Sequence, residues 1–390
     1  MNTPTEQVFG NAHIVLAGSV VFGSVRVVDG LIREIDESPE TGRASSVMTV
    51  DCQGDFLIPG LIELHTDHLE THYSPRPGVR WGMKAAIQAH DAQIAAAGIT
   101  TVFDCLRMGM EDEDQFETGE MRRLATALRE ARDQNRLRVE HRLHLRCEVS
   151  ARDMLSDFSE FAEDADVGLV SMMDHAPGQR QFTSMEAFKL YHQSKHKMSD
   201  DVYDRYFASR IAGSRKYSDR NRRALAEQCV ERGVVMASHD DATLAHVEES
   251  IRFGVRLAEF PTTLEAAKAS HDAGLGVLMG APNVVRGRSH SGNVAARTLV
   301  ENRCLDILSS DYVPASLLQA AFSLAEDSRL MGIPEAIATV TANPARFIGL
   351  HDRGEIAPGL RADLVRVAYL PEQDPAPIVR SVWLKGERVS

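Results

Sequence analysis

The sequence predicts an α/β protein, a (β/α)8 TIM barrel with a small β-sandwich domain built from both chain ends. Eight short apolar segments between residues 57 and 312 alternate with Ala-rich or charged stretches of helical pattern. Val- and Ile-rich segments precede and follow this alternation. A chain of 390 residues, 43% of them hydrophobic, is long enough to bury a core of this size.

The small β domain is expected to take its N-terminal part from residues 1–58 and its C-terminal part from residues 350–390. Short segments rich in Val and Ile, punctuated by Gly or Asp, are typical of strands. They cover residues 8–16, 20–30, 31–36 and 47–52 at the start and 362–370 and 377–389 at the end. We expect the two groups of strands to pair with each other, with the barrel inserted between them.

The barrel is expected over residues 59–349. Its predicted strands are 57–67, 98–106, 139–148, 167–175, 233–241, 256–263, 276–283 and 305–312. Helical patterns such as 83–98, 119–134 and 244–254 lie between them. Residues 182–232 form a charged helical insertion that is longer than a normal crossover. It is interpreted as a lid, an interface or a surface elaboration, and the sequence does not decide between these.

Composition excludes several classes of partner. The net charge of −13 disfavours nonspecific binding to nucleic acid or to an anionic membrane, although local arginine clusters can still bind a small anionic substrate. No segment approaches the roughly 18 apolar residues needed to cross a bilayer. The N-terminus lacks a secretory signal, and the five scattered cysteines include no CxxC pair. These features indicate free thiols in the cytoplasm, and they leave a homo-oligomer open.

Ionisable side chains end several of the predicted barrel strands. Active sites of such barrels lie at the C-terminal strand ends, so these residues are expected to meet. Imidazoles and carboxylates without cysteine are ligands for divalent zinc, with manganese or iron as alternatives. The candidate ligands for one or two such ions are His65, Asp67, Glu148, His175, His239 and Asp311.

Alternation along the third strand predicts which of its side chains enter the barrel. Arg142, His144, Arg146 and Glu148 share the inner face, whereas Leu143, Leu145 and Cys147 share the face expected to pack on helices. Buried charges need partners or a ligand. This strand therefore points to a polar, ligand-binding interior.

Further cations lie on loops that follow the strands, in a protein that is acidic overall. Each alone is typical of a solvated surface, but together they favour an anion-binding site. The candidate substrate-binding residues are Arg76, Arg180, Arg286, Arg288 and His290.

Two signatures identify a superfamily resemblance. FLIPGLIELHTD resembles the first-strand signature of the amidohydrolase superfamily, and TANPARFIGLHDRGEIAPGLRADLVRV with VWLKGERV resembles its C-terminal signature. The resemblance implies a metal-dependent (β/α)8 barrel with a small β-sandwich. Two departures stand out: the usual His-x-His pair is His65-Thr66-Asp67, and AEFPTT replaces the segment with the sixth-strand histidine.

A narrower resemblance runs over essentially the whole chain. GLIELHTDHLE, HRLHLRCE, MDHAPGQRQF, ASHDDAT, LMGAPNVVRGRSHSGN and DILSSDYVPASLL resemble the PhnM family, the α-D-ribose 1-methylphosphonate 5-triphosphate diphosphatases of the carbon–phosphorus lyase pathway. This resemblance implies metal-dependent hydrolysis to the 5-phosphate with release of pyrophosphate. It also implies that Asp311 orients the attacking water and takes its proton.

Two other functions are compatible with the same pattern. The first is an amidohydrolase that acts on a cyclic amide or a related C–N bond, which would not need a cradle of arginines sized for a triphosphate. The second is a non-catalytic barrel that serves as a scaffold, which would have no use for buried strand-end charges. A substrate panel discriminates the first and metal analysis the second.

Overall fold

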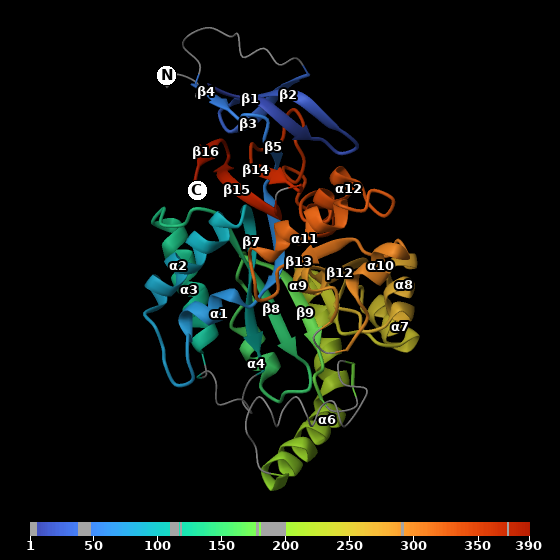
Figure 1. The fold of residues 1–390 in the computed structure, drawn as a ribbon. Helices are drawn as coiled ribbons and strands as arrows, with labels where there is room; N and C mark the ends of the chain where they lie inside the picture. Colours follow the sequence, from blue (N-terminus) through green and yellow to red (C-terminus); the bar gives the residue numbers. More distant parts are fainter. Residues whose placement is uncertain are drawn as a thin grey trace.

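A computed structural model describes residues 6–37, 48–109, 117, 119–176, 179–180, 200–289, 292–372 and 374–390, with the side chains of 200–204, 374 and 375 excepted. Figure 1 shows a small β-sheet with both chain ends at one end of the molecule and a barrel beneath it. One long helix projects from the opposite end (Figure 1). The predicted fold class is confirmed.

The barrel consists of eight strands that are hydrogen-bonded in sequence order, with every neighbouring pair parallel. A parallel bridge between Thr66 and Asp311 brings the last strand next to the first. Each of the eight predicted segments overlaps one barrel strand, and the first predicted segment, 57–67, is divided at Gly60 between β5 (Phe56–Pro59) of the small sheet and β6 of the barrel. The strands are β6 (Leu61–Thr66), β7 (Ile99–Met108), β8 (Glu140–Glu148), β9 (Val167–Met173), β10 (Val235–His239), β11 (Leu257–Glu259), β12 (Gly276–Gly280) and β13 (Ile307–Ser309).

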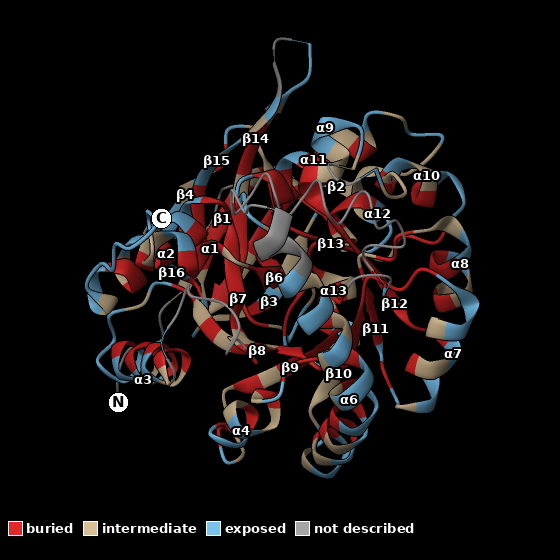
Figure 2. Ribbon diagram, turned by 90° about the horizontal axis from the view of Figure 1, so that it is seen from below, coloured by how far each residue is buried: buried red, intermediate tan, exposed pale blue. Residues whose placement is uncertain are grey.

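Helices surround the barrel, with buried faces toward the strands and exposed faces outward (Figure 2). Thr243 and Thr263 cap two of them through hydrogen bonds from the backbone N–H groups of His246 and Ala266. The helices are α1 (His68–Tyr73), α2 (Met83–Ala96), α3 (Glu120–Asp133), α4 (Met154–Ser159), α6 (Asp200–Arg232), α7 (Leu244–Arg252), α8 (Leu264–Asp272), α9 (Ala281–Arg286), α10 (Ala296–Glu301), α11 (Ser316–Ala325), α12 (Ile333–Ala338) and α13 (Ala342–Phe347).

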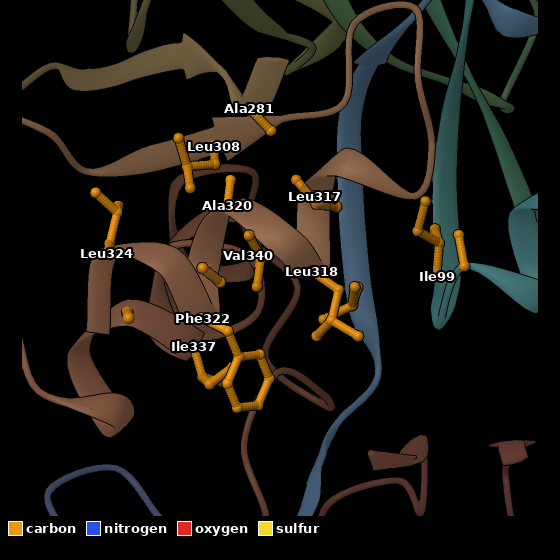
Figure 3. Packing of buried hydrophobic residues seen from close by; sticks show 14 of the residues in the cluster. Ile99, Ala281, Leu308, Leu317, Leu318, Ala320, Phe322, Leu324, Ile337 and Val340 are labelled. Carbon is orange, nitrogen blue, oxygen red and sulfur yellow. The ribbon is translucent and has the colours of Figure 1, made fainter. Parts of the chain in front are cut away.

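The apolar core lies mainly between the strands and the helices. Leu317, Ala320 and Phe322 of α11 pack there with Leu308 of β13 (Figure 3). The predicted outer face of β8 is confirmed, because Leu143, Leu145 and Cys147 belong to a cluster that also contains buried residues of α2 and α3. A separate apolar layer fills the barrel itself. It is formed by Ile62, Leu64, Phe103, Leu169, Ala237, Leu257, Leu278 and Ile307.

The chain ends form one mixed sheet of strands in the order β16-β15-β14-β5-β1-β2-β3, with β4 beside β1. Its aromatic core pairs Phe9 with Trp383 at 4.9 Å between ring centroids. Its strands are β1 (Glu6–Val15), β2 (Val20–Val28), β3 (Leu31–Asp36), β4 (Met48–Asp51), β5 (Phe56–Pro59), β14 (Leu364–Leu370), β15 (Asp374–Leu384) and β16 (Glu387–Arg388).

Gly60 alone separates β5 of the small sheet from β6 of the barrel. A Cβ atom at Gly60 would lie 2.2 Å from Oγ1 of Thr100, so only glycine fits there without a shift of the Thr100 side chain. The small sheet and the barrel therefore share one nearly continuous strand, which ties the position of β6 to both.

The predicted insertion at residues 182–232 is described only from residue 200 onward, where it forms α6. Its C-terminal half is held against the strand ends of the barrel. Asn221 donates hydrogen bonds to the carbonyl oxygens of Val149 and Ala151 at 3.0 and 2.8 Å. Ser218 donates a hydrogen bond to Asp174 at 2.7 Å. Among the residues that the structure describes, no helix combines the length and apolar character required to cross a membrane.

Candidate active site

A cavity of about 280 Å³ opens at the C-terminal strand ends, where the barrel fold is expected to place an active site. Residues from seven of the eight strand ends or the loops after them meet in it. Its polar and charged lining consists of His65, Asp67, Arg146, His175, His239, Asp240, Asn283, Arg286, Arg288, Ser289, Asn293, Asp311 and Tyr312. The sequence predicted His65, Asp67, His175, His239 and Asp311 at one site, and the structure brings these five together.

Three lining residues have left-handed backbone conformations. Asp240, Phe260 and Asp311 directly follow or closely follow strand ends and have φ angles of 58°, 52° and 55°. Such conformations cost about 1–3 kcal/mol each in side chains other than glycine, and they cluster at functional sites. Here they turn side chains away from the strand alternation and into the cavity.

His175, His239 and Asp240 form a compact centre in the cavity wall. Their candidate ligand atoms all lie within 4.8 Å of one another. Oδ2 of Asp240 lies 3.5 Å from Nε2 of His239 and 3.7 Å from Nε2 of His175. This buried oxygen has no hydrogen-bond partner in the described part of the chain. Two imidazoles therefore face an unsatisfied carboxylate oxygen.

Carboxylates behind the two imidazoles set their orientation. Nδ1 of His239 lies 3.1 Å from Glu259, and Nδ1 of His175 lies 2.8 Å from Glu148. An ionised carboxylate only accepts hydrogen bonds, so each Nδ1 carries a proton. Burial lowers the pKa of His239, so the lone pair of its neutral ring lies on Nε2, toward Asp240. Burial would lower the pKa of His175 as well, but Asp240 and Glu148 outweigh it and raise this pKa to about 9, so Nε2 of His175 must release its proton before it can bind a metal ion. This carboxylate–histidine arrangement is the one that commonly supports a bound metal ion.

Glu148 was predicted as a metal ligand, and the structure instead places it behind His175. Its carboxylate accepts hydrogen bonds from Ser150 and from the His175 backbone, and it lies 3.4 Å from Arg210 of α6. Burial raises the pKa of Glu148, but His175 and Arg210 outweigh this and lower it to about 2. Its oxygens are thus occupied by protein groups.

Glu259 contacts two histidines and a serine of the site, and it was not among the residues predicted from the sequence. One of its oxygens lies 3.1 Å from Nδ1 of His65, and the other accepts a 2.6 Å hydrogen bond from Ser171 and lies near His239. The hydroxyl of Ser171 also lies 2.5 Å from Nε2 of His144. Glu259 occupies the strand that lacks the sixth-strand histidine, and its carboxylate orients histidines from other strands.

Asp67 is paired with Arg146, the inward-facing arginine of β8. Burial alone would raise the pKa of Asp67, but Arg146 and Arg107 lower it well below its usual range. The same pairing raises the pKa of the Arg146 guanidinium despite its burial. Arg146 also lines the cavity, so it is a cation of the site that the predicted substrate-binding set did not contain.

Asp311 is positioned by its backbone between two strands. Its N–H donates to the carbonyl oxygen of His65 at 3.2 Å, and its carbonyl accepts from the Asp67 N–H at 3.0 Å. Beneath it, the buried carboxylate of Glu63 accepts from the backbone N–H groups of His65 and Ser310. The Asp311 backbone is thus fixed at the junction of the first and eighth strands, and the residue lines the cavity.

Only some of the predicted substrate-binding cations line the cavity in the structure. Arg286 and Arg288, at the end of α9 and just after it, line the cavity. Arg76 is exposed in a turn after α1 and is not part of the lining, and His290 lies outside the described residues. Arg180 is buried and paired with Asp241 and Glu249, so its charge is neutralised within the protein rather than presented to the cavity.

Comparisons with known proteins agree with this geometry. Residues 76–390 match the amidohydrolase family. The chain is 45% identical over 383 residues to the α-D-ribose 1-methylphosphonate 5-triphosphate diphosphatase of Escherichia coli (strain K12), covering 98% of this chain and all of that protein. An imidazolonepropionase of Deinococcus deserti is 36% identical over 114 residues, 26% of this chain and 28% of that one.

A solved structure shows the same fold across nearly all of both chains. N-acetylglucosamine-6-phosphate deacetylase from Pasteurella multocida superimposes with a TM-score of 0.65 at 14% identity, covering 98% of this chain and 99% of that one.

Proposed function

The chain belongs to the amidohydrolase family and is a hydrolase, and from this premise we propose that it hydrolyses α-D-ribose 1-methylphosphonate 5-triphosphate to the 5-phosphate and pyrophosphate in phosphonate catabolism. The observation that carries the proposal is the composition of the cavity. A histidine–carboxylate centre faces the same space as Arg146, Arg286 and Arg288. Full-length identity of 45% to a protein named for this reaction supports the substrate class.

The residues around Asp240 suit a divalent cation. The buried Oδ2 atom lacks a hydrogen-bond partner among the described residues, and it faces the Nε2 atoms of His175 and His239. Two imidazoles and a carboxylate with room for water are a ligand set typical of catalytic zinc, and manganese or iron would also be accepted. His65, Asp67 and Asp311 could hold a second ion. A cation bound there supplies Lewis acidity and activates water at neutral pH.

Asp311 is proposed as the general base. Its carboxylate lies on the cavity wall next to the histidine–carboxylate centre, where it can accept a proton from a water molecule directed at the substrate. The oxygen of that water bonds to the phosphorus attached to the ribose 5-oxygen. The bond from this phosphorus to the bridging oxygen breaks, and its electron pair leaves with pyrophosphate.

Three arginines offset the negative charge of the leaving group. Charge-assisted hydrogen bonds from guanidinium groups to phosphate oxygens are short and strong, and fixed donors need no reorganisation during the reaction. Arg286 and Arg288 lie on the α9 side of the cavity, and Arg146 lies on the β8 side. This distribution on two walls fits a leaving group of two phosphoryl units.

Turnover in ¹⁸O-labelled water tests the proposed bond cleavage. We expect the label in the ribose 5-phosphate and unlabelled pyrophosphate, both measured by mass spectrometry. Label in pyrophosphate, or orthophosphate as the first product, would place the attack at another phosphorus. Hydrolysis of a cyclic amide at comparable kcat/KM, with no triphosphate turnover, would instead favour the C–N hydrolase that the wider family allows.

A further inference from the structure

A second group of histidines lies outside the cavity, where α1 packs against α2. His68 and His72 are four residues apart on α1, a spacing that places both imidazoles on one face of a helix. His90 of α2 faces them. The candidate ligand nitrogens of all three lie within 4.8 Å of one another. The two helices lie side by side on the outer wall of the barrel (Figure 1).

The tautomer of His90 is fixed by a buried carboxylate. Nε2 of His90 lies 2.7 Å from Oδ1 of Asp104, whose other oxygen lies 2.7 Å from Nδ1 of His141. Because the carboxylate accepts both hydrogen bonds, Nε2 of His90 carries the proton and Nδ1 carries the lone pair. That Nδ1 atom faces His68, so Asp104 orients His90 as a supporting carboxylate orients a metal ligand.

The nitrogen positions fit a small tetrahedral ion. Nδ1 of His68 and Nδ1 of His90 are 3.4 Å apart. Zinc–nitrogen bonds of about 2.0–2.1 Å in a tetrahedron give nitrogen–nitrogen separations of about 3.3–3.4 Å. The half-buried His72 ring makes a side-chain hydrogen bond with Gln93, but its Nε2 atom has no hydrogen-bond partner in the described ranges. A buried ring nitrogen without a partner is costly unless something occupies its lone pair.

We propose that His68, His72 and His90 form a zinc-binding site on the barrel wall, with water as the fourth ligand. The site is separate from the candidate active site, because none of the three histidines lines the cavity that the described residues form. Its zinc would cross-link α1 to α2. Since α1 begins directly after Asp67, the cross-link also anchors the backbone that carries Asp67 at the cavity. This proposal is independent of the substrate assigned above.

Zinc binding to a protein with a disabled cavity tests the site. The background variant carries His65→Gln, His175→Gln, His239→Gln and Asp311→Asn, which remove ligands from both candidate ion positions of the cavity but leave α1 and α2 intact. We expect this protein to retain one zinc ion per chain by elemental analysis after dialysis. A folded background variant that retains no zinc and binds none on titration would overturn the proposal.

Adding His72→Gln to that background should remove the zinc. Loss of a direct ligand should weaken zinc binding by more than the roughly 10–100-fold typical of losing a supporting group. His351→Gln is the matched control, because His351 is exposed and outside the cluster. Zinc should raise the Tm of the control protein and not that of the His72→Gln protein. Equal zinc affinity in the two proteins, with equal far-UV circular dichroism, would refute the site.

Discussion

Two buried carboxylates, Glu259 at the mouth of the barrel and Asp104 in its wall, each lie within hydrogen-bonding distance of two histidines. Both side chains are fully buried. They differ in what the second nitrogen of each histidine faces. Nε2 of His239 faces the cavity and Asp240, whereas Nε2 of His141 lies 3.3 Å from Asp91 of α2. A carboxylate–histidine pair therefore does not by itself identify an active site. The group that faces the second ring nitrogen of the histidine determines whether the pair can bind a ligand.

The pKa values of His141 and His239 differ in the same way as the groups that face their second ring nitrogens. Burial lowers the pKa of both histidines. At His141 the two aspartates outweigh burial and raise the pKa to about 9. At His239 burial dominates, and the net pKa is lowered. The wall thus holds a charged His141 in an ion pair, and the mouth holds a neutral His239 with a lone pair available for a ligand. His239 lies beside His175, whose pKa is raised to about 9 by Asp240 and Glu148 despite burial.

Exchanging each carboxylate for its amide should have different effects in the two regions: loss of stability at Asp104 and loss of function at Glu259. In Asp104→Asn the charged His141 loses a buried partner, and we expect the free energy of unfolding to fall by about 3–5 kcal/mol. The kcat of the remaining folded protein, measured with enough zinc to saturate the site formed by His68, His72 and His90, should be unchanged. Chemical denaturation and activity per folded molecule measure the two effects. A large loss of kcat without loss of stability would contradict the structural role of Asp104.

The matched change at the mouth, Glu259→Gln, should act on function. Glutamine cannot accept hydrogen bonds at both of the positions that face His65 and His239. We expect activity or metal affinity to fall by about 10–100-fold, as is typical when a group behind a metal ligand is changed. Steady-state kinetics with elemental analysis measure this. Wild-type kinetics and metal content in this variant would remove Glu259 from the functional centre.

The charged wall predicts a loss of stability at alkaline pH. His141 has a folded pKa of about 9 and an ordinary value of 6.5, so the folded state holds its proton more tightly. Its contribution is full below about pH 6.5 and is lost as the pH rises through about 9, which amounts to about 3 kcal/mol. Urea denaturation across this range should show the decline, and His141→Asn should flatten it. An equally steep decline in the variant would assign it to other groups.

The last prediction compares an arginine that lines the cavity with one that lies outside it. Arg288→Ala removes a cation of the cavity and should lower kcat/KM for the triphosphate. The expected loss of transition-state stabilisation is about 1.5–3 kcal/mol, the contribution of a hydrogen bond to a charged group. Arg76→Ala is the matched control, since Arg76 is exposed outside the cavity. Steady-state kinetics should show no change in the control. An equal loss in both variants would indicate a general electrostatic effect instead of a local contact.

Much of the fold could be predicted because strand and helix patterns alternate so regularly. The same regularity brought His65, His175, His239 and Asp311 to one cavity, since parallel strands of a barrel end at one face. Strand alternation could not place Asp240, because its left-handed φ of 58° turns it toward the imidazoles. Nor could the sequence show that Asp241 and Glu249 neutralise Arg180, since these partners come from a different loop and helix.

The union of the chain ends in one sheet has a consequence for synthesis on the ribosome. β5 is bonded on one side to β1 and on the other to β14, which begins at Leu364, some three hundred residues later in the chain. At about 5–20 residues per second, β14 follows β5 by roughly 15–60 s. During that interval the nascent β5 has an open hydrogen-bonding edge, the kind of surface that recruits foreign strands. We therefore expect the nascent chain to need protection by chaperones until its last strands emerge.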